Sequence, residues 1–99
     1  FTSSGVGRKG RAYWGAYSIS KFATEAMMQI LSEELQNTSS IRVNCINPGA
    51  VRTKMRESAY PAEDPNKNPT AEMIMELYLY LMSDMSSGIN GQSLDAQEH

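Results

Sequence analysis

The sequence has few of the residues that build metal centres and disulfide bridges. Its 99 residues include one cysteine, Cys45, and one histidine, His99. A single cysteine excludes an internal disulfide bond and favours a cytoplasmic location. A single histidine at the end of the chain argues against a histidine-based catalytic triad, and no cluster of metal-ligand residues is visible. We therefore expect no metal site.

Long apolar runs and a large net charge are also missing. The longest apolar run, residues 77–82, is far shorter than the roughly 18 residues of a membrane-spanning helix. Nine basic and eleven acidic residues leave a net charge of −2, so we expect neither a membrane nor a nucleic-acid partner. The composition, with 40% hydrophobic residues, is typical of a globular protein, and the length fits one domain.

The apolar pattern predicts alternating strands and helices. The predicted order is a strand end at 1–4, a glycine-rich loop at 5–13, a helix at 14–36, a strand at 41–46, a long polar loop at 50–68, a helix that begins at Asn68 and Pro69, and a short strand within 91–95. A strand, a long helix and a second strand in this order favour a parallel sheet. Because so few strands cannot form a stable open sheet alone, we expect half of an α/β domain.

The predicted helix at 14–36 has two apolar faces separated by a polar stripe. The first face holds Ile19, Phe22, Ala23, Ala26, Met27 and Ile30, the second holds Met28, Leu31 and Leu35, and the stripe holds Ser18, Glu25, Gln29, Ser32 and Gln36. A helix with two apolar faces needs two partners. We expect one partner to be its own sheet and the other to be a second subunit.

Tyr17 and Lys21 stand four residues apart in this helix. At that spacing two side chains lie on the same face, one turn apart. A phenol is a weak acid at neutral pH, and a nearby ammonium favours its ionised form. The pair is therefore a candidate for proton transfer to or from a substrate. The alternative interpretation is an ordinary pair on a helix surface.

Two further segments follow the predicted strands at their carboxyl ends, where α/β sheets bind ligands. Ser4 follows the first strand, and its hydroxyl can hydrogen-bond a substrate oxygen. Residues 48–53 follow the second strand, at the same sheet edge if the strands are parallel. The alternatives are a serine that satisfies the local backbone and a plain turn.

Three strings in this order resemble the short-chain dehydrogenase/reductase family. They are "SSG" at residues 3–5, "YSISK" at 17–21 and "RVNCINPGAVRT" at 42–53, followed by a polar loop and a helix. The resemblance extends from Thr2 to Asp95 and is to bacterial oxidoreductases of the single-domain type. It implies a doubly wound, parallel-sheet Rossmann fold, of which residues 1–99 are the C-terminal half. It also implies hydride transfer between NADP or NAD and a small carbonyl or secondary alcohol substrate.

The resemblance implies catalytic roles for Ser4, Tyr17 and Lys21. Tyr17 is expected to protonate the carbonyl oxygen and to act as the base in the reverse direction. Lys21 is expected to favour the ionised form of Tyr17 and to hydrogen-bond the nicotinamide ribose. Ser4, rather than its neighbour Ser3, is expected to orient and polarise the substrate oxygen.

The resemblance also implies a cofactor-binding set and an oligomer. The cofactor-binding residues are Tyr17, Lys21, Pro48, Gly49, Val51 and Thr53. Pro48 and Gly49 are expected to border the nicotinamide ring, while Val51 and Thr53 hold its carboxamide. Residues 54–68 are expected to form a lid over the substrate. The helix at 14–36 is expected to pair with its copy in a homodimer or homotetramer.

The chain departs from the family pattern at both ends. The family's phosphate-binding loop, first strands and catalytic asparagine are expected upstream of Phe1. At the other end, Asp95-Ala96-Gln97 stands where many members have Asp-Gly-Gly. Two alternatives stay open: a sugar-nucleotide epimerase or dehydratase, which can share the Tyr/Lys pair, and a fragment without activity of its own. We expect the isolated 99 residues to be inactive.

The string "GVGRKG" at residues 5–10 matches the G-x-G-x-x-G fingerprint of dinucleotide-binding loops. That fingerprint needs a full strand before it, a helix that begins within it and an acidic residue about 20 positions later. Only four residues precede Gly5, the predicted helix begins after Gly10, and position 30 is isoleucine. We therefore expect this string to be a connecting loop, with the true phosphate loop outside the chain.

Overall fold

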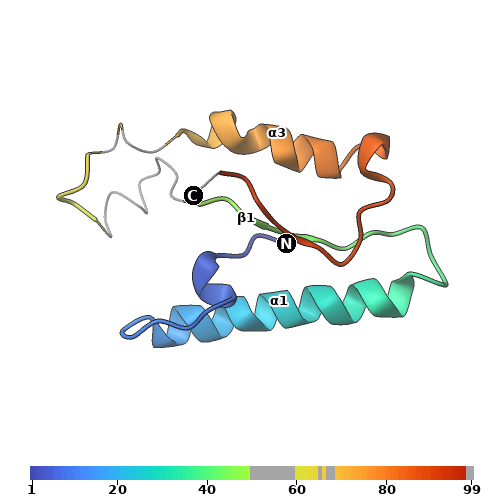
Figure 1. The fold of residues 1–99 in the computed structure, drawn as a ribbon, viewed down its shortest axis with the longest axis horizontal. Helices are drawn as coiled ribbons and strands as arrows, with labels where there is room; N and C mark the ends of the chain where they lie inside the picture. Colours follow the sequence, from blue (N-terminus) through green and yellow to red (C-terminus); the bar gives the residue numbers. More distant parts are fainter. Residues whose placement is uncertain (50–59, 65, 67–68, 98–99) are drawn as a thin grey trace.

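The structure is a computed structural model that describes residues 1–49, 60–64, 66 and 69–97. A short parallel sheet lies between two helices that run along its opposite sides (Figure 1). In chain order the elements are the 3₁₀ helix η1 (Gly5–Gly7), α1 (Gly15–Leu35), β1 (Cys45–Asn47), α3 (Ala71–Leu81), the 3₁₀ helix η3 (Asp84–Ser86) and β2 (Ser93–Asp95). This alternation of helices and parallel strands confirms the predicted α/β class.

The sheet joins three segments that lie far apart in the sequence. β1 and β2 pair in parallel, with Ile46 opposite Leu94. On the other side of β1, Thr2 forms a parallel bridge with the same Ile46, which confirms the predicted strand end at 1–4. The carboxyl ends of all three segments therefore meet at one edge of the sheet.

The two connections between these segments place their helices on opposite faces of the sheet (Figure 1). α1 connects the Thr2 segment to β1, α3 connects β1 to β2, and both connections step in the same direction across the sheet. Two crossover connections that step in the same direction across a parallel sheet, but place their helices on opposite faces, have opposite handedness. One of the two therefore has the uncommon left-handed form.

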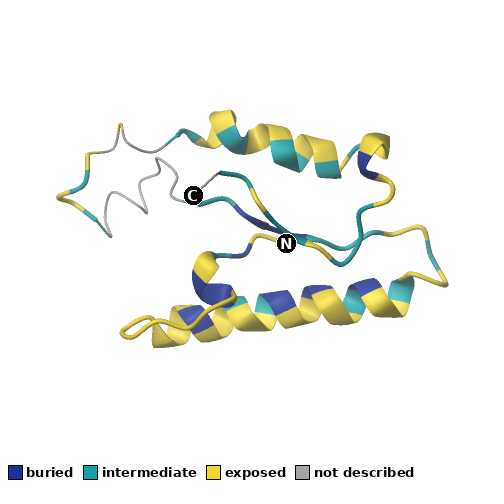
Figure 2. Ribbon diagram, viewed as in Figure 1, coloured by how far each residue is buried: buried dark blue, intermediate teal, exposed yellow. Residues whose placement is uncertain are grey.

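The long helix is present within one residue of its predicted bounds. Its buried side combines the predicted second apolar face, of which Met28 is buried and Leu31 and Leu35 are half-buried, with part of the predicted polar stripe. The residues of α1 that are buried are Ser18, Glu25, Met28 and Ser32. They lie on the side that faces the strands (Figure 2). The first predicted apolar face is solvent-exposed in this chain, with Ile19 72% and Ile30 56% exposed. Three members of the predicted polar stripe thus face the sheet.

Hydrogen bonding explains why polar side chains occupy the buried side of α1. The Ser18 hydroxyl donates to the carbonyl oxygen of Val6 at 2.5 Å. Glu25 accepts a hydrogen bond from Ser93 of β2 at 2.9 Å. Ser32 donates to the carbonyl oxygen of Gln29 within its own helix. Buried polar groups are tolerated when they are paired in this way, so hydropathy alone did not indicate that these three polar residues would be buried beside Met28.

The strand expected at 41–46 is shorter and lies later, at Cys45–Asn47. Its first part is held by side-chain amides together with a backbone hydrogen bond, in which the N–H of Gly91 donates to the carbonyl oxygen of Val43 at 2.9 Å. The backbone N–H of Val43 donates to Oδ1 of Asn90, and Asn44 Oδ1 accepts from the backbone N–H of Gln92. Ile41, which precedes the strand, is 58% exposed.

The second long helix begins later than predicted. α3 starts at Ala71, and its N-cap is Thr70 in an extended conformation rather than Asn68. Asn68 itself lies outside the described residues. Ile74, Leu77 and Leu81 are half-buried on one side of the helix, whereas Met73 is 67% exposed. The predicted short strand within 91–95 is confirmed by β2.

The apolar core of the described residues is small. The hydrophobic side chains that are buried are Val6, Met28, Cys45 and Ile46. The accessible surface of the chain is 7089 Å², whereas a compact protein of this mass has about 5600 Å². Much apolar surface is therefore left without a partner inside the chain. In the part of the chain that the structure describes, no helix has the length and apolar character needed to cross a bilayer.

Candidate active site

Tyr17 and Lys21 lie together near the start of α1. The Lys21 ammonium is 5.5 Å from the centroid of the Tyr17 ring. The same ammonium donates to the carbonyl oxygen of Thr2 at 3.2 Å, which holds it beside the end of the first strand segment. Tyr17 is 45% exposed, so its hydroxyl is open to a ligand. The predicted pair thus has the proximity that its spacing implies.

Trp14 adds an aromatic contact that the sequence reasoning missed. Its ring meets the Tyr17 ring edge-on, with centroids 5.8 Å apart. On its other side it stacks with Tyr60, at 6.5 Å between centroids and 26° between planes. Tyr60 belongs to the predicted lid at 54–68, most of which lies outside the described residues. The spacing in the sequence could have indicated this contact, since residues three apart at the start of a helix lie next to each other.

Ser4 and Ser3 have different surroundings, and these favour Ser4 as the accessible hydroxyl. Ser3 is 2% exposed and contacts the buried carboxylate of Glu25. Ser4 is half-buried and caps η1, where its Oγ accepts a weak hydrogen bond from the backbone N–H of Val6 at 3.4 Å. This is the local-backbone role of the alternative interpretation. Because Ser4 acts there as the acceptor, its hydroxyl proton is still available for a ligand.

The turn after β1 lies at the edge where the strands end. Asn47 is buried, and its Oδ1 accepts from the backbone N–H of Gly49 at 3.1 Å. Gly49 has a φ of 74°, a left-handed conformation that glycine adopts without strain. The Gln97 side chain donates to the carbonyl oxygen of Pro48 at 2.6 Å. The other two predicted cofactor residues, Val51 and Thr53, lie outside the described residues.

Glu25 is a buried carboxylate one turn beyond Lys21. Burial alone raises the pKa of the Glu25 carboxyl, but hydrogen bonds and a nearby cation outweigh burial and hold the pKa below its usual value. These partners are Ser3, Ser93, Cys45 and Arg8. The Cys45 thiol is fully buried, and burial together with the neighbouring carboxylate raises its pKa to about 11. Cys45 is therefore a protonated packing residue and not a nucleophile.

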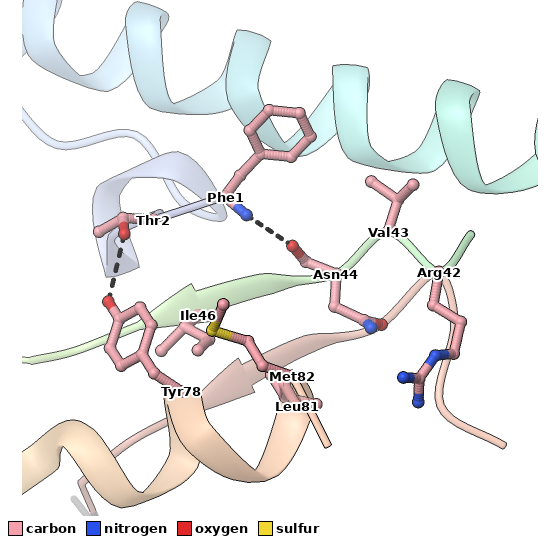
Figure 3. Close-up of a pocket in the computed structure, with 9 residues that line it drawn as sticks. All are labelled: Phe1, Thr2, Arg42, Val43, Asn44, Ile46, Tyr78, Leu81 and Met82. Atoms are coloured by element: carbon pink, nitrogen blue, oxygen red, sulfur yellow. Dashed lines mark hydrogen bonds between the residues drawn. The ribbon is translucent and has the colours of Figure 1, made fainter. Parts of the chain in front are cut away.

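A cavity of about 410 Å³ lies on the α3 side of the sheet (Figure 3). It is lined by Phe1, Thr2, Arg42, Val43, Asn44, Ile46, Tyr78, Leu81 and Met82. At its edge the hydroxyl groups of Thr2 and Tyr78 are 3.2 Å apart. None of the predicted site residues that the structure describes, namely Ser4, Tyr17, Lys21, Pro48 and Gly49, lines this cavity. It is therefore separate from the group formed by Ser4, Tyr17 and Lys21.

The described residues fit a nicotinamide dinucleotide in chemical terms. Parallel α/β sheets bind such ligands at the carboxyl edge of their strands, and both Ser4 and the turn at 48–49 lie at that edge. The left-handed Gly49 lets the backbone turn sharply there. The Lys21 ammonium can donate hydrogen bonds to hydroxyl groups of a ribose.

Comparison with known proteins agrees with this geometry. The short chain dehydrogenase family matches residues 1–64, which is most of the chain. The chain therefore belongs to the short chain dehydrogenase family, and its partial α/β fold is part of the Rossmann fold of that family.

Similar proteins include both curated sequences and crystal structures. An uncharacterised oxidoreductase of Escherichia coli K12, YciK, is 61% identical over 97 residues, which cover 98% of this chain and 38% of that protein. The NADPH-dependent aldehyde reductase 2 of Arabidopsis thaliana chloroplasts is 36% identical over 84% of this chain and 34% of its own length. A short chain dehydrogenase from Escherichia coli CFT073, in a crystal structure with NADPH, is 60% identical with a TM-score of 0.92, over 99% of this chain and 40% of that one. The chain thus spans well under half the length of these relatives.

Proposed function

We propose that residues 1–99 are the C-terminal part of a single-domain oxidoreductase that interconverts a small carbonyl compound and a secondary alcohol. The observation that carries the proposal is the proximity of the Lys21 ammonium to the Tyr17 ring, beside the strand edge that holds Ser4. The preference for NADP(H) over NAD(H) rests on the relative crystallised with NADPH and on the NADPH-dependent reductase.

In the reduction direction the chain's own residues manage the proton. NADPH, when bound, supplies the hydride. The Tyr17 hydroxyl donates its proton to the carbonyl oxygen, and the Lys21 ammonium stabilises the phenolate that remains. Ser4, whose Oγ accepts from the backbone N–H of Val6, donates a hydrogen bond to the same substrate oxygen and orients it, without giving up its proton. In the oxidation direction the Tyr17 phenolate removes the proton from the alcohol.

The proposal includes a homodimer or homotetramer that forms through α1. Its support is the set of apolar α1 side chains that face solvent in this chain, namely Ile19, Phe22, Met27 and Ile30. Contiguous apolar patches of this kind are typical of subunit contacts. A second copy of α1 presents the same apolar side chains, so the two helices can bury these faces against each other.

The test uses Tyr17→Phe in the full-length protein that contains these residues. A panel of aldehydes and ketones is offered with NADPH and NADH, and the nicotinamide absorbance is followed. We expect turnover to fall about a hundredfold or more, because a proton donor is lost, while the dissociation constant for NADPH stays nearly unchanged. Tyr13→Phe is the matched control, because Tyr13 is fully exposed and should keep wild-type turnover. Wild-type carbonyl reduction by Tyr17→Phe would overturn the assignment.

A further inference from the structure

Arg8 connects the loop between Ser4 and Tyr17 to the end of strand β2. Its Nη1 donates to Oδ1 of Asp95 at 2.7 Å. Its Nε and Nη2 donate to the hydroxyl of Ser93 at 3.0 and 2.8 Å. The planar guanidinium thus spans the last strand with several donors in one plane, an arrangement that a lysine ammonium cannot reproduce.

The contacts of Arg8 continue from β2 to the turn after β1. Asp95 Oδ1 also accepts from the Asn47 side-chain amide at 3.1 Å. The Oδ1 of Asn47 in turn accepts from the backbone N–H of Gly49 at 3.1 Å. Arg8 is therefore connected through two side chains to the turn that is predicted to border the nicotinamide ring.

Arg8 also reaches the helix that holds Tyr17 and Lys21. Its Nε lies 3.8 Å from a carboxylate oxygen of Glu25, which stands one turn beyond Lys21. The Ser93 hydroxyl contacts both groups, since it accepts from Arg8 and donates to Glu25. Glu25 is 7% exposed, whereas the Arg8 side chain is 31% exposed, so this contact is partly shielded from solvent.

The backbone near Arg8 is fixed independently of its side chain. Arg8 is the C-cap of η1, and its N–H donates to the carbonyl oxygen of Gly5 at 3.1 Å. η1 packs against α1 through the Ser18–Val6 hydrogen bond. The guanidinium therefore acts from a rigid base, so its contacts can set the distance between η1 and the strand edge.

We propose that Arg8 is a positioning residue that holds the Tyr17–Lys21 helix, the Ser4 loop and the turn at 48–49 in register. This role rests on the proposed oxidoreductase function. Arg8 touches neither substrate nor cofactor. It acts on the turn through Asp95 and Asn47, and on the helix through Glu25. With both segments held in place, the Tyr17 hydroxyl faces the oxygen of the substrate carbonyl group and the nicotinamide faces its carbon. Small losses of alignment between reacting groups lower rates strongly.

The experiment compares Arg8→Met with Lys9→Met in the full-length protein. Lys9 is the adjacent basic residue and is exposed, and its ammonium has no ion-pair partner in the described part of the chain. The dissociation constant for NADPH is measured by nicotinamide fluorescence, and kcat is measured with the carbonyl compound of the panel that the wild type reduces fastest. We expect Arg8→Met to weaken NADPH binding about tenfold and to lower kcat about tenfold. Lys9→Met should change both by less than twofold.

Two further variants separate positioning from a structural role. Asp95→Asn should also weaken NADPH binding and lower kcat. The double variant should lose little more than either single variant, because both substitutions remove the same contact. Arg8→Lys keeps the charge but not the planar donors and should recover only part of kcat. All variants are compared at a temperature where circular dichroism shows them fully folded.

The outcomes distinguish the two proposals. A wild-type protein that binds no NADPH and reduces no member of the panel overturns the proposed function, and the role of Arg8 with it. An active wild type in which Arg8→Met lowers only the melting temperature, with kinetics like Lys9→Met, overturns the positioning role alone. Equal losses in Arg8→Met and Lys9→Met also overturn it, because they show only attraction of the cofactor phosphates by positive charge.

Discussion

The backbone of Gly7 lies directly against Lys21. A Cβ atom placed on Gly7 would come within 2.8 Å of the Lys21 Cβ and 2.9 Å of the Lys21 carbonyl oxygen. No real side chain fits at these distances unless one of the two segments moves. The absence of a side chain at position 7 is therefore what lets η1, and with it the Ser4 loop, pack onto the helix that carries Tyr17.

Gly7→Ala is expected to destabilise the full-length protein by about 1–3 kcal/mol, because the new methyl group must displace backbone rather than a flexible side-chain end. The free energy of unfolding is measured by urea denaturation. Gly15→Ala is the control: nothing lies within 4 Å of the added Cβ, and alanine favours a helix, so this variant should be neutral or slightly more stable. Equal stability of the two variants would contradict the close approach.

Glu25→Gln is expected to lower the free energy of unfolding at pH 7 by about 1–3 kcal/mol, because buried hydrogen bonds to a charged group are weakened. The folded-state pKa of Glu25 is lowered, so the stabilisation by the carboxylate is fully present above the unfolded-state value, near 4.5, and is lost as the pH falls through the lower folded-state pKa. The difference in the free energy of unfolding between wild type and Glu25→Gln should therefore shrink as the pH falls below the unfolded-state value.

Urea denaturation of wild type and Glu25→Gln between pH 7 and pH 3 measures this difference. Glu33→Gln is the matched control, because Glu33 lies on the exposed part of the same helix and should alter stability little at any of these pH values. A difference for Glu25→Gln that stays constant down to the lowest pH would show that the charge of Glu25 does not stabilise the fold.

The long helix and the Tyr17–Lys21 pair could be predicted because both depend on local spacing. A periodic pattern over more than twenty residues marks a helix, and a separation of four places two side chains on one face. The location of Ser4 and of the turn at 48–49 at one edge of the sheet also followed from the position of each just after a strand. Family resemblance added the roles, which local spacing does not contain.

The burial of polar residues on α1 could not be predicted, because the groups that pair with them are distant in the sequence. Glu25 is paired with Ser93, which lies 68 residues away. Arg8 is paired with Asp95, which lies 87 residues away. Hydropathy assigns such residues to solvent, since it does not register partners that the fold brings together. The segment before β1 also depends on distant partners: the backbone N–H of Val43 donates to Asn90, and Asn44 accepts from the backbone N–H of Gln92.

The exposed apolar side of α1 predicts an assembly that a single charge can disrupt. Ile30→Asp, at a position 56% exposed in this chain, should convert the full-length protein from a dimer or tetramer to smaller species, because an unpaired charge in an apolar contact is costly. Size-exclusion chromatography with light scattering measures the mass. Glu34→Asp, one turn further along the same helix and also exposed, is the control and should keep the wild-type mass. If the wild-type protein is a monomer, the proposal that this face of α1 is a subunit contact is wrong.

The 99-residue chain alone is expected to bind NADPH no more tightly than the millimolar range, although it contains Tyr17 and Lys21. Its described core is limited to four buried hydrophobic side chains, while residues such as Ile19, Leu79 and Met82 are more than 60% exposed. A two-stranded parallel sheet with so little apolar burial gives a marginal fold, because the gain from burial barely offsets the entropy of ordering the chain.

The isolated chain should therefore unfold without a sharp transition and bind a hydrophobic dye such as anilinonaphthalene sulfonate, in contrast to the full-length protein. Fluorescence titration with NADPH, run on both proteins under the same conditions, measures the difference in affinity. If the isolated chain binds NADPH at micromolar concentration, the residues of this segment hold the cofactor without help from any other part of the protein, and the proposal that it is one part of a larger binding domain is wrong.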